Sequence, residues 1–118
     1  MSHSKILCVS YDATVSNYRR EALEKAGYDV LGTTDVKEAS RLLDVENFDL
    51  LVIGHRFSAQ QKRDLIVQAK KHEPMPVLLV CGSSSDSDLA VDGRVYALQG
   101  VEGLVNGVAK LLPVPSAA

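Results

Sequence analysis

The sequence predicts an α/β protein whose parallel sheet is covered by helices on both faces. The two runs 50–53 and 77–81 are wholly apolar, as in strands that are buried on both sides. Between such runs, apolar residues recur at spacings of three and four, which is typical of helices that pack with one face. Strands that alternate with helices indicate right-handed βαβ units and therefore a parallel sheet between two helical layers.

Five strand–helix units account for the chain from residue 5 to residue 112. The expected strands are 6–9, 28–33, 49–53, 77–81 and 94–98. The expected helices are 14–26, one that begins after Asp35, one that begins after Ser58, a short fourth helix around 89–91, and 101–112. The alternating pattern of 28–33 suits an edge strand with one solvated side.

Local signals mark the helix ends and the buried faces. Asp35 with Glu38, and Ser58 with Gln61, have the spacing of capping boxes. Gly27 stands where a left-handed residue closes a helix. The expected inward residues of the first helix are Val15, Tyr18, Ala22, Leu23 and Ala26. Those of the later helices are Val36, Ala39, Leu42 and Leu43, then Leu65, Ile66 and Ala69, and finally Leu104, Val105, Val108, Leu111 and Leu112.

Length and composition predict one domain over residues 1–118, with a core over 5–112 and a frayed tail over 113–118. A net charge of −2 argues against a nucleic-acid surface, and no apolar run is long enough to cross a membrane. We recognise no signal peptide at the N-terminus. Cys8 and Cys81, the only two cysteines, fall in predicted strands, which favours reduced thiols and a cytoplasmic protein.

The order and lengths of these elements resemble the receiver domain of bacterial response regulators. The run 6–9, with a helix that closes at 25–28, is similar to the opening unit of that family. The runs 49–53 and 76–80 resemble its third and fourth strands. The resemblance covers residues 6–112 and implies a flavodoxin-like (βα)5 fold with strand order 2-1-3-4-5.

The resemblance also places the phosphorylation chemistry of the family on this chain. Receivers bind Mg²⁺ through an acidic pair after the first strand and phosphorylate an Asp after the third. Here the acidic pair falls on Ser10 and Tyr11, and the acceptor falls on Gly54. The hydroxyl residue after the fourth strand falls on Cys81, and the Lys after the fifth falls on Ala97 or Gln99. The Met-Pro and Asp-Gly pairs of the family fall on Phe57-Ser58 and Gln61-Lys62.

This pattern implies a degenerate receiver with no phosphoacceptor, no metal, no cofactor and no enzymatic activity. We expect it to act in two-component signalling through contact with another signalling protein, and a homodimer is possible. The face expected to make this contact consists of Tyr96, Gln99 and Glu102. Neither nucleic acid nor membrane is an expected partner.

Two alternatives remain at this stage. A small-ligand sensor would use a pocket at the carboxyl ends of the strands, lined by Tyr11, Asp12, Gly54, His55, Cys81 and Ser83. A redox switch or thiol enzyme would use Cys81, with His55 as the residue that activates the thiol. For Cys81 a role as a small buried filler is favoured, because free cysteines are among the most buried residues.

Overall fold

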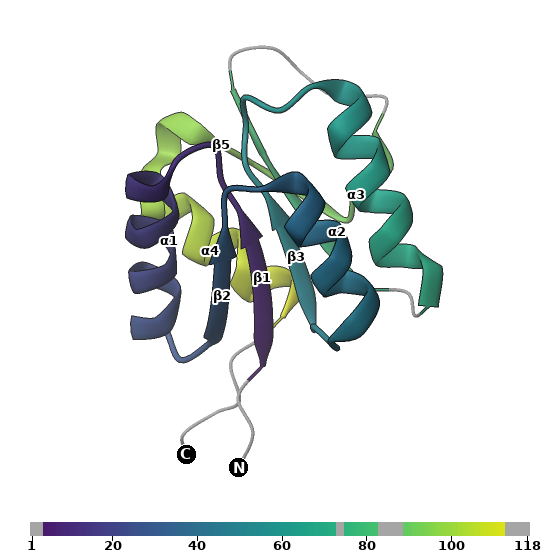
Figure 1. Cartoon of the computed structure of the whole chain (residues 1–118). Helices are drawn as coiled ribbons and strands as arrows, with labels where there is room; N and C mark the ends of the chain where they lie inside the picture. The colour runs from purple at the N-terminus through teal and green to yellow at the C-terminus, as the bar shows by residue number, and fades with distance from the viewer. Residues whose placement is uncertain (1–3, 73–74, 83–88, 113–118) are drawn as a thin grey trace.

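Five parallel strands form one sheet in the order β2-β1-β3-β4-β5 in the computed structural model (Figure 1). Residues 4–72, 75–82 and 89–112 are described. The strands are β1 (Lys5–Val9), β2 (Asp29–Thr33), β3 (Leu50–Ile53), β4 (Val77–Cys81) and β5 (Gly93–Tyr96). All four strand pairings are parallel. The predicted strand order and parallel sheet are therefore confirmed.

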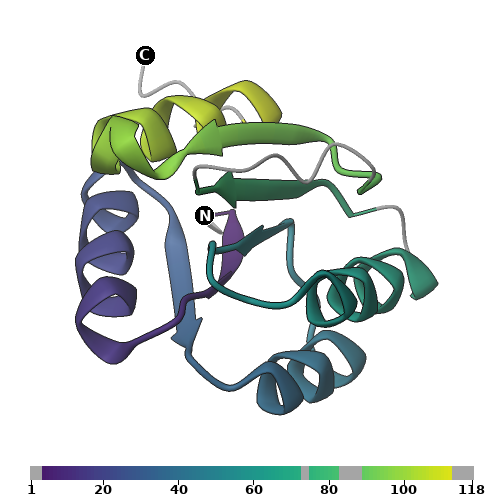
Figure 2. The ribbon, with the colours of Figure 1, turned by 90° about the horizontal axis from the view of Figure 1, so that it is seen from above.

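Two pairs of helices cover the sheet, one pair on each face (Figure 2). The helices are α1 (Ala13–Lys25), α2 (Val36–Val45), α3 (Ala59–His72) and α4 (Gly100–Leu111). α1 packs beside α4 on one face, and α2 packs beside α3 on the other. The three-layer arrangement follows from right-handed crossovers between parallel strands.

The core divides into two clusters because neighbouring residues of a strand point to opposite faces of the sheet. Every residue of β3 is buried, with 0% exposure from Leu50 to Ile53. Leu51 and Ile53 pack against the α2 and α3 face, whereas Leu50 and Val52 pack against the α1 and α4 face. The two cysteines also separate, since Cys81 belongs to the first cluster and Cys8 to the second.

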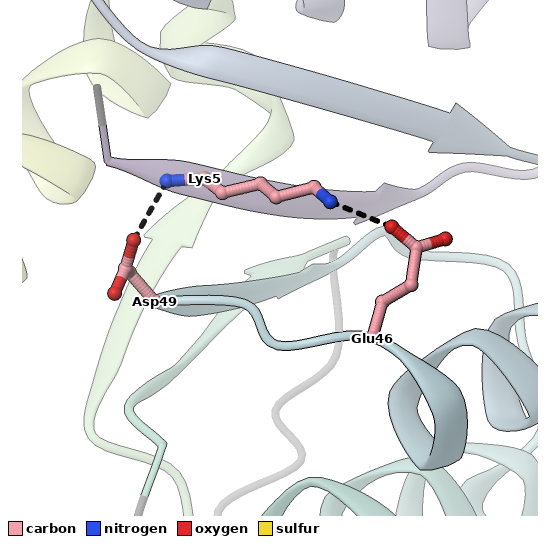
Figure 3. Close-up of polar contacts among 3 residues, drawn as sticks. All are labelled: Lys5, Glu46 and Asp49. Carbon is pink, nitrogen blue, oxygen red and sulfur yellow. Dashed lines mark hydrogen bonds and ion pairs between the residues drawn. The ribbon is translucent and has the colours of Figure 1, made fainter. Parts of the chain in front are cut away.

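Lys5 joins the amino ends of β1 and β3, opposite the edge where ligands usually bind (Figure 3). Its backbone N–H donates to Asp49 Oδ2 at 2.8 Å, and its Nζ lies 2.6 Å from Glu46 Oε1. The Asp49 N–H donates in turn to the Lys5 carbonyl at 2.7 Å. These contacts fix the register in which β3 enters the sheet beside β1.

Several predicted helix ends are confirmed. The Ser58 hydroxyl accepts from the Gln61 N–H at 3.1 Å while Gln61 Oε1 accepts from the Ser58 N–H at 2.9 Å, so this capping box is present. Asp35 caps α2 by accepting from the Lys37 N–H at 2.9 Å. Gly27 has a φ of 104°, the left-handed conformation predicted for it.

The predicted buried face of α1 is correct for Leu23, which is fully buried, and for Ala26, which packs against the core, but it is wrong for Tyr18. Tyr18 was expected inside, but its exposed fraction is 63%. The buried residues are Ser16, Arg19 and Leu23, and their spacing of three and four places them on one stripe. The long side chain of Arg19 reaches polar partners at the end of the sheet, which lets a charged residue occupy a buried position.

The region between β4 and β5 also differs from the prediction. Residues 89–92 are not helical, so the short helix expected around 89–91 is absent there. Leu89 is buried, and the Asp92 carboxylate accepts from the Val77 N–H at 2.7 Å, which holds this segment against β4. Residues 83–88 and the expected tail 113–118 lie outside the described residues.

The end of β5 is shorter than predicted. The strand stops at Tyr96, and a 3₁₀ turn, η1 (Ala97–Gln99), leads directly into α4. The cause is Gln99, whose Oε1 accepts from the Tyr96 N–H at 2.8 Å and so closes the turn. The last helix begins at Gly100, one residue before the predicted start.

Candidate functional site at the carboxyl edge of the sheet

Ser10 and Gly54 lie side by side where β1 and β3 end. The Gly54 N–H donates to the Val9 carbonyl at 2.8 Å, which extends the pairing of the two strands by one residue. Ser10 is fully buried, and its N–H donates to the Thr33 carbonyl at 3.1 Å. The two positions that the resemblance assigns to an acidic residue and to the acceptor Asp are therefore adjacent, as the fold requires.

The guanidinium of Arg19 occupies the space beside Gly54. A β-carbon built on Gly54 would lie 2.7 Å from Arg19 Nη1 and 3.0 Å from the Val9 carbonyl oxygen. Arg19 comes from the middle of α1, and its exposed fraction is only 8%. Any side chain at Gly54 would therefore have to displace a buried cation.

Neutral groups hold Arg19 in place. Its Nη1 donates to Ser10 Oγ at 3.3 Å, and its Nη2 lies 3.5 Å from His55 Nδ1. Ser10 Oγ also lies 3.7 Å from Cys8 Sγ. Burial raises the pKa of the Cys8 thiol, although the Ser10 hydrogen bond and the charge of Arg19 oppose the rise. Cys8 therefore gives Arg19 no thiolate counter-ion near neutral pH.

Two aromatic rings and a second arginine lie next to this group. The rings of Tyr11 and His55 meet edge to face, with centroids 5.1 Å apart. The Arg56 guanidinium lies 4.7 Å from the centroid of the Tyr11 ring, within the range of a cation–π contact. Arg56 has a φ of 74°, a conformation that few residues other than glycine adopt. The chain turns sharply there after β3.

His55 is a weak base in this setting. Burial lowers its pKa below the usual value of 6.5, and the positive charges of Arg19, Arg56 and Lys62 lower it further. An arginine can only donate hydrogen bonds, so the contact with Arg19 requires His55 Nδ1 to accept and places the ring proton on Nε2. A neutral His55 ring adds no fourth positive charge to those of Arg19, Arg56 and Lys62.

This arrangement predicts how stability depends on pH. The unfolded chain binds a proton at His55 near pH 6.5, whereas the folded protein binds it only at lower pH, so stability should fall as the pH drops through 6.5. We expect His55→Gln to lose less stability than the wild type between pH 7.5 and 5.5. Urea unfolding of both proteins at these two pH values measures the difference. Parallel losses in the two proteins would contradict the lowered pKa.

The structure scatters the other residues of the predicted pocket. Asp12 is exposed and caps α1, since its Oδ1 accepts from the Val15 N–H at 2.8 Å. Cys81 is 1% exposed and packs on the α2 and α3 face, as expected for a filler. Ser83 lies outside the described residues. Of the predicted pocket residues that the structure describes, only Tyr11 and His55 line a common cavity, of about 280 Å³, which lies between α1, β5 and α4.

Ala97 and Gln99 were the two candidates for the family Lys. Ala97 directly follows β5, and the Gln99 side chain is engaged with the Tyr96 backbone. Both side chains are uncharged, so neither can replace the positive charge of the family lysine.

The donors at this edge do not fit the Mg²⁺ site of a receiver. Mg²⁺ takes oxygen ligands in near-octahedral geometry, usually with carboxylates among them. Here the residues that meet at Gly54 offer a hydroxyl, a guanidinium and an imidazole. Among the described residues, no group of three or more His, Cys, Asp or Glu side chains could hold a metal ion.

Arg19 is the residue of this site that the sequence analysis missed. The predicted inward face of this helix was built from apolar residues and included its neighbour Tyr18 instead. The available signal was the spacing of Ser16, Arg19 and Leu23, which share one helical stripe. The burial of Lys62, which is 5% exposed, was also not predicted.

Comparison with known proteins places the fold. No family model and no curated protein matches the sequence. A CheY-like receiver domain protein from Methanospirillum hungatei superposes with a TM-score of 0.80 at 22% identity, over 93% of this chain and 94% of that chain. The chemotaxis response regulator CheY4 of Vibrio cholerae gives 0.78 at 17% identity, over 94% of this chain and 100% of that chain.

The chain has the receiver-domain fold. The structure of HP1043, an orphan response regulator of H. pylori, is also similar, with a TM-score of 0.76 at 15% identity over 92% of this chain and 96% of that chain. The resemblance seen in the sequence is thus confirmed at the level of the fold. Within the described part of this receiver fold, no helix is long and apolar enough to cross a membrane.

Proposed function

We propose that this chain is a receiver-like signalling module that acts through protein–protein contact and not through phosphorylation of an aspartate. The supporting observation is the position of Arg19, whose Nη1 lies 2.7 Å from the place where the β-carbon of a side chain at Gly54 would be. Phosphoryl transfer to a receiver needs carboxylates that bind Mg²⁺ and accept the phosphoryl group. At this edge the chain instead brings Arg19, Arg56 and Lys62 close enough to lower the pKa of His55.

The proposed setting is the bacterial cytoplasm, in a two-component system, and the proposed role is not enzymatic. Without a phosphoacceptor aspartate, the module would not switch between a phosphorylated and an unphosphorylated form, and it would bind its partner in a single form. Its output would then depend on the amount of the protein or on a second input.

The end of β5 offers a surface for such a partner. Tyr96 is 52% exposed and Leu98 is fully exposed, and both lie where the edge strand passes into η1. Gln99 and Glu102, the other residues of the predicted contact face, are also exposed. The hydrogen bond from the Tyr96 N–H to Gln99 fixes this turn, so the apolar side chains are presented on a rigid support. Exposed aromatic residues on rigid elements are frequent anchors of protein interfaces.

Affinity capture from the cytoplasm of the native cells tests this proposal, with the immobilised protein as bait. A partner that binds through this surface should be retained by the wild type and lost with Leu98→Asp or Tyr96→Ala. Val67→Asp is the matched control, because Val67 is 67% exposed on α3, on the opposite face of the sheet. Equal loss in the control, or retention by all variants, would contradict the proposed surface.

A further inference from the structure

The cavity between α1, β5 and α4 combines apolar walls with one charged group. Its volume is about 280 Å³, close to the lower limit of small-molecule sites. Val15, Val95 and Leu104 contribute apolar wall, and Tyr18 and Tyr96 contribute aromatic rings. Arg19 and His55 line the same cavity.

Arg19 brings a buried positive charge to this cavity that the described residues do not neutralise. Its exposed fraction is 8%, and its hydrogen-bond partners in the described part of the chain, the Ser10 hydroxyl and the His55 ring, are both uncharged. A buried cation is costly unless a counter-ion or several hydrogen bonds compensate it. The contacts to Ser10 and His55, at 3.3 and 3.5 Å, are long for hydrogen bonds, so the guanidinium retains donor capacity.

We propose that this cavity binds a small organic carboxylate with an aromatic or aliphatic body, and that Arg19 receives the carboxylate. A guanidinium matches a carboxylate with two parallel hydrogen bonds, and His55 can add a donor from Nε2. Arg56 and Lys62 add positive charge near the cavity, since both lie close enough to His55 to lower its pKa. The ligand supplies the negative charge that no described residue gives to Arg19.

The walls and the volume define the body of the ligand. Valine and leucine walls disfavour a free inorganic phosphate relative to an organic acid, because the phosphate would lose its hydration without replacement. The volume corresponds to roughly nine water molecules at about 30 Å³ each, so a single ring with a short side chain fits. The tyrosine rings of Tyr18 and Tyr96 favour stacking with an aromatic body. This site shares Tyr96 with the proposed partner surface, but it goes beyond the proposed function, and its binding can be tested on the purified protein without a partner.

Titration of the ¹⁵N-labelled protein with benzoate, phenylacetate and hexanoate, followed by amide NMR, tests the site. At least one of these acids should bind saturably, with shifts centred on Arg19, His55 and Tyr96. Benzamide has the shape of benzoate without its charge and should bind at least about tenfold more weakly, because a hydrogen bond to a charged group is the stronger one. Inorganic phosphate should bind more weakly than the organic acids.

Arg19→Met should weaken the binding of the best acid by about tenfold or more. Arg20→Met is the matched control, because Arg20 is its neighbour on α1 but pairs with Glu24 at 3.0 Å on the surface. Binding to this control should equal binding to the wild type. If Arg19→Met does not fold, the comparison of benzoate with benzamide on the wild type still decides. Absence of saturable binding by all three acids, equal binding of benzamide, or shifts centred elsewhere would overturn the proposal.

Discussion

Gly107→Ala should destabilise the protein by about 2 kcal/mol, although glycine to alanine inside a helix ordinarily stabilises by up to about 1 kcal/mol. Gly107 lies in α4 and is buried against β5. A β-carbon there would overlap Val95 Cγ1 and would contact both methyl groups of Leu78 at 3.5 Å. The cost of this overlap should therefore exceed the gain in helix propensity. A decrease in the free energy of unfolding would indicate the overlap, and an increase would indicate the helix propensity.

Urea or guanidinium unfolding measures this change. Asn106→Ala, at an exposed position of the same helix, is the matched control and should shift the free energy of unfolding by no more than about 0.5 kcal/mol. Val95→Ala in the Gly107→Ala background should recover part of the loss, because it removes the overlapping methyl. A Gly107→Ala protein that is more stable than the wild type would show that α4 does not pack this closely on β5.

The second large effect concerns Arg19 and Gly54. Both Gly54→Asp and Gly54→Asn must move the guanidinium, which lies 2.7 Å from the added β-carbon. Only the aspartate can then form an ion pair with it. We expect Gly54→Asp to be more stable than Gly54→Asn by about 2 kcal/mol, because a buried charge gains from a charged hydrogen-bond partner.

Repeating this comparison in the Arg19→Met background isolates the pair. Without the guanidinium, Gly54→Asp should no longer be more stable to unfolding than Gly54→Asn. A carboxylate that is buried there without a partner should make Gly54→Asp the less stable of the two. An advantage that persists without Arg19 would show that the cation does not lie beside Gly54. Neither variant should accept a phosphoryl group, because Ser10 and Tyr11 still provide no carboxylate for Mg²⁺.

The fold could be predicted because its signals are local. The apolar runs that became β3 and β4 and the capping pair Ser58 and Gln61 each dictate structure over a few residues. Parallel strands joined by right-handed crossovers then leave few possible topologies. The segment at 89–92 escaped prediction because a distant contact, the acceptance by Asp92 of the Val77 N–H, determines its path.

The position of the site at the carboxyl edge of the sheet could be predicted from the sequence. The sequence correctly brought Ser10 and Gly54 together at one edge of the sheet, since strand ends in a parallel sheet share that edge. It could not reveal that Arg19 fills the space, because a helix that is one residue out of phase exchanges Arg19 for Tyr18. Two other predicted pocket residues lie away from the pocket for different reasons, because Asp12 caps α1 and the Cys81 side chain points to the α2 and α3 face of the sheet.

The most direct test of the central claim is the intact mass of the protein after incubation with a small phosphodonor and Mg²⁺. A receiver-domain protein that phosphorylates under the same conditions serves as the positive control. With Arg19 beside Gly54 and no acidic pair, this chain should show no acid-labile phosphoryl adduct. An acid-labile adduct that maps to an aspartate at the carboxyl edge of the sheet would contradict the account.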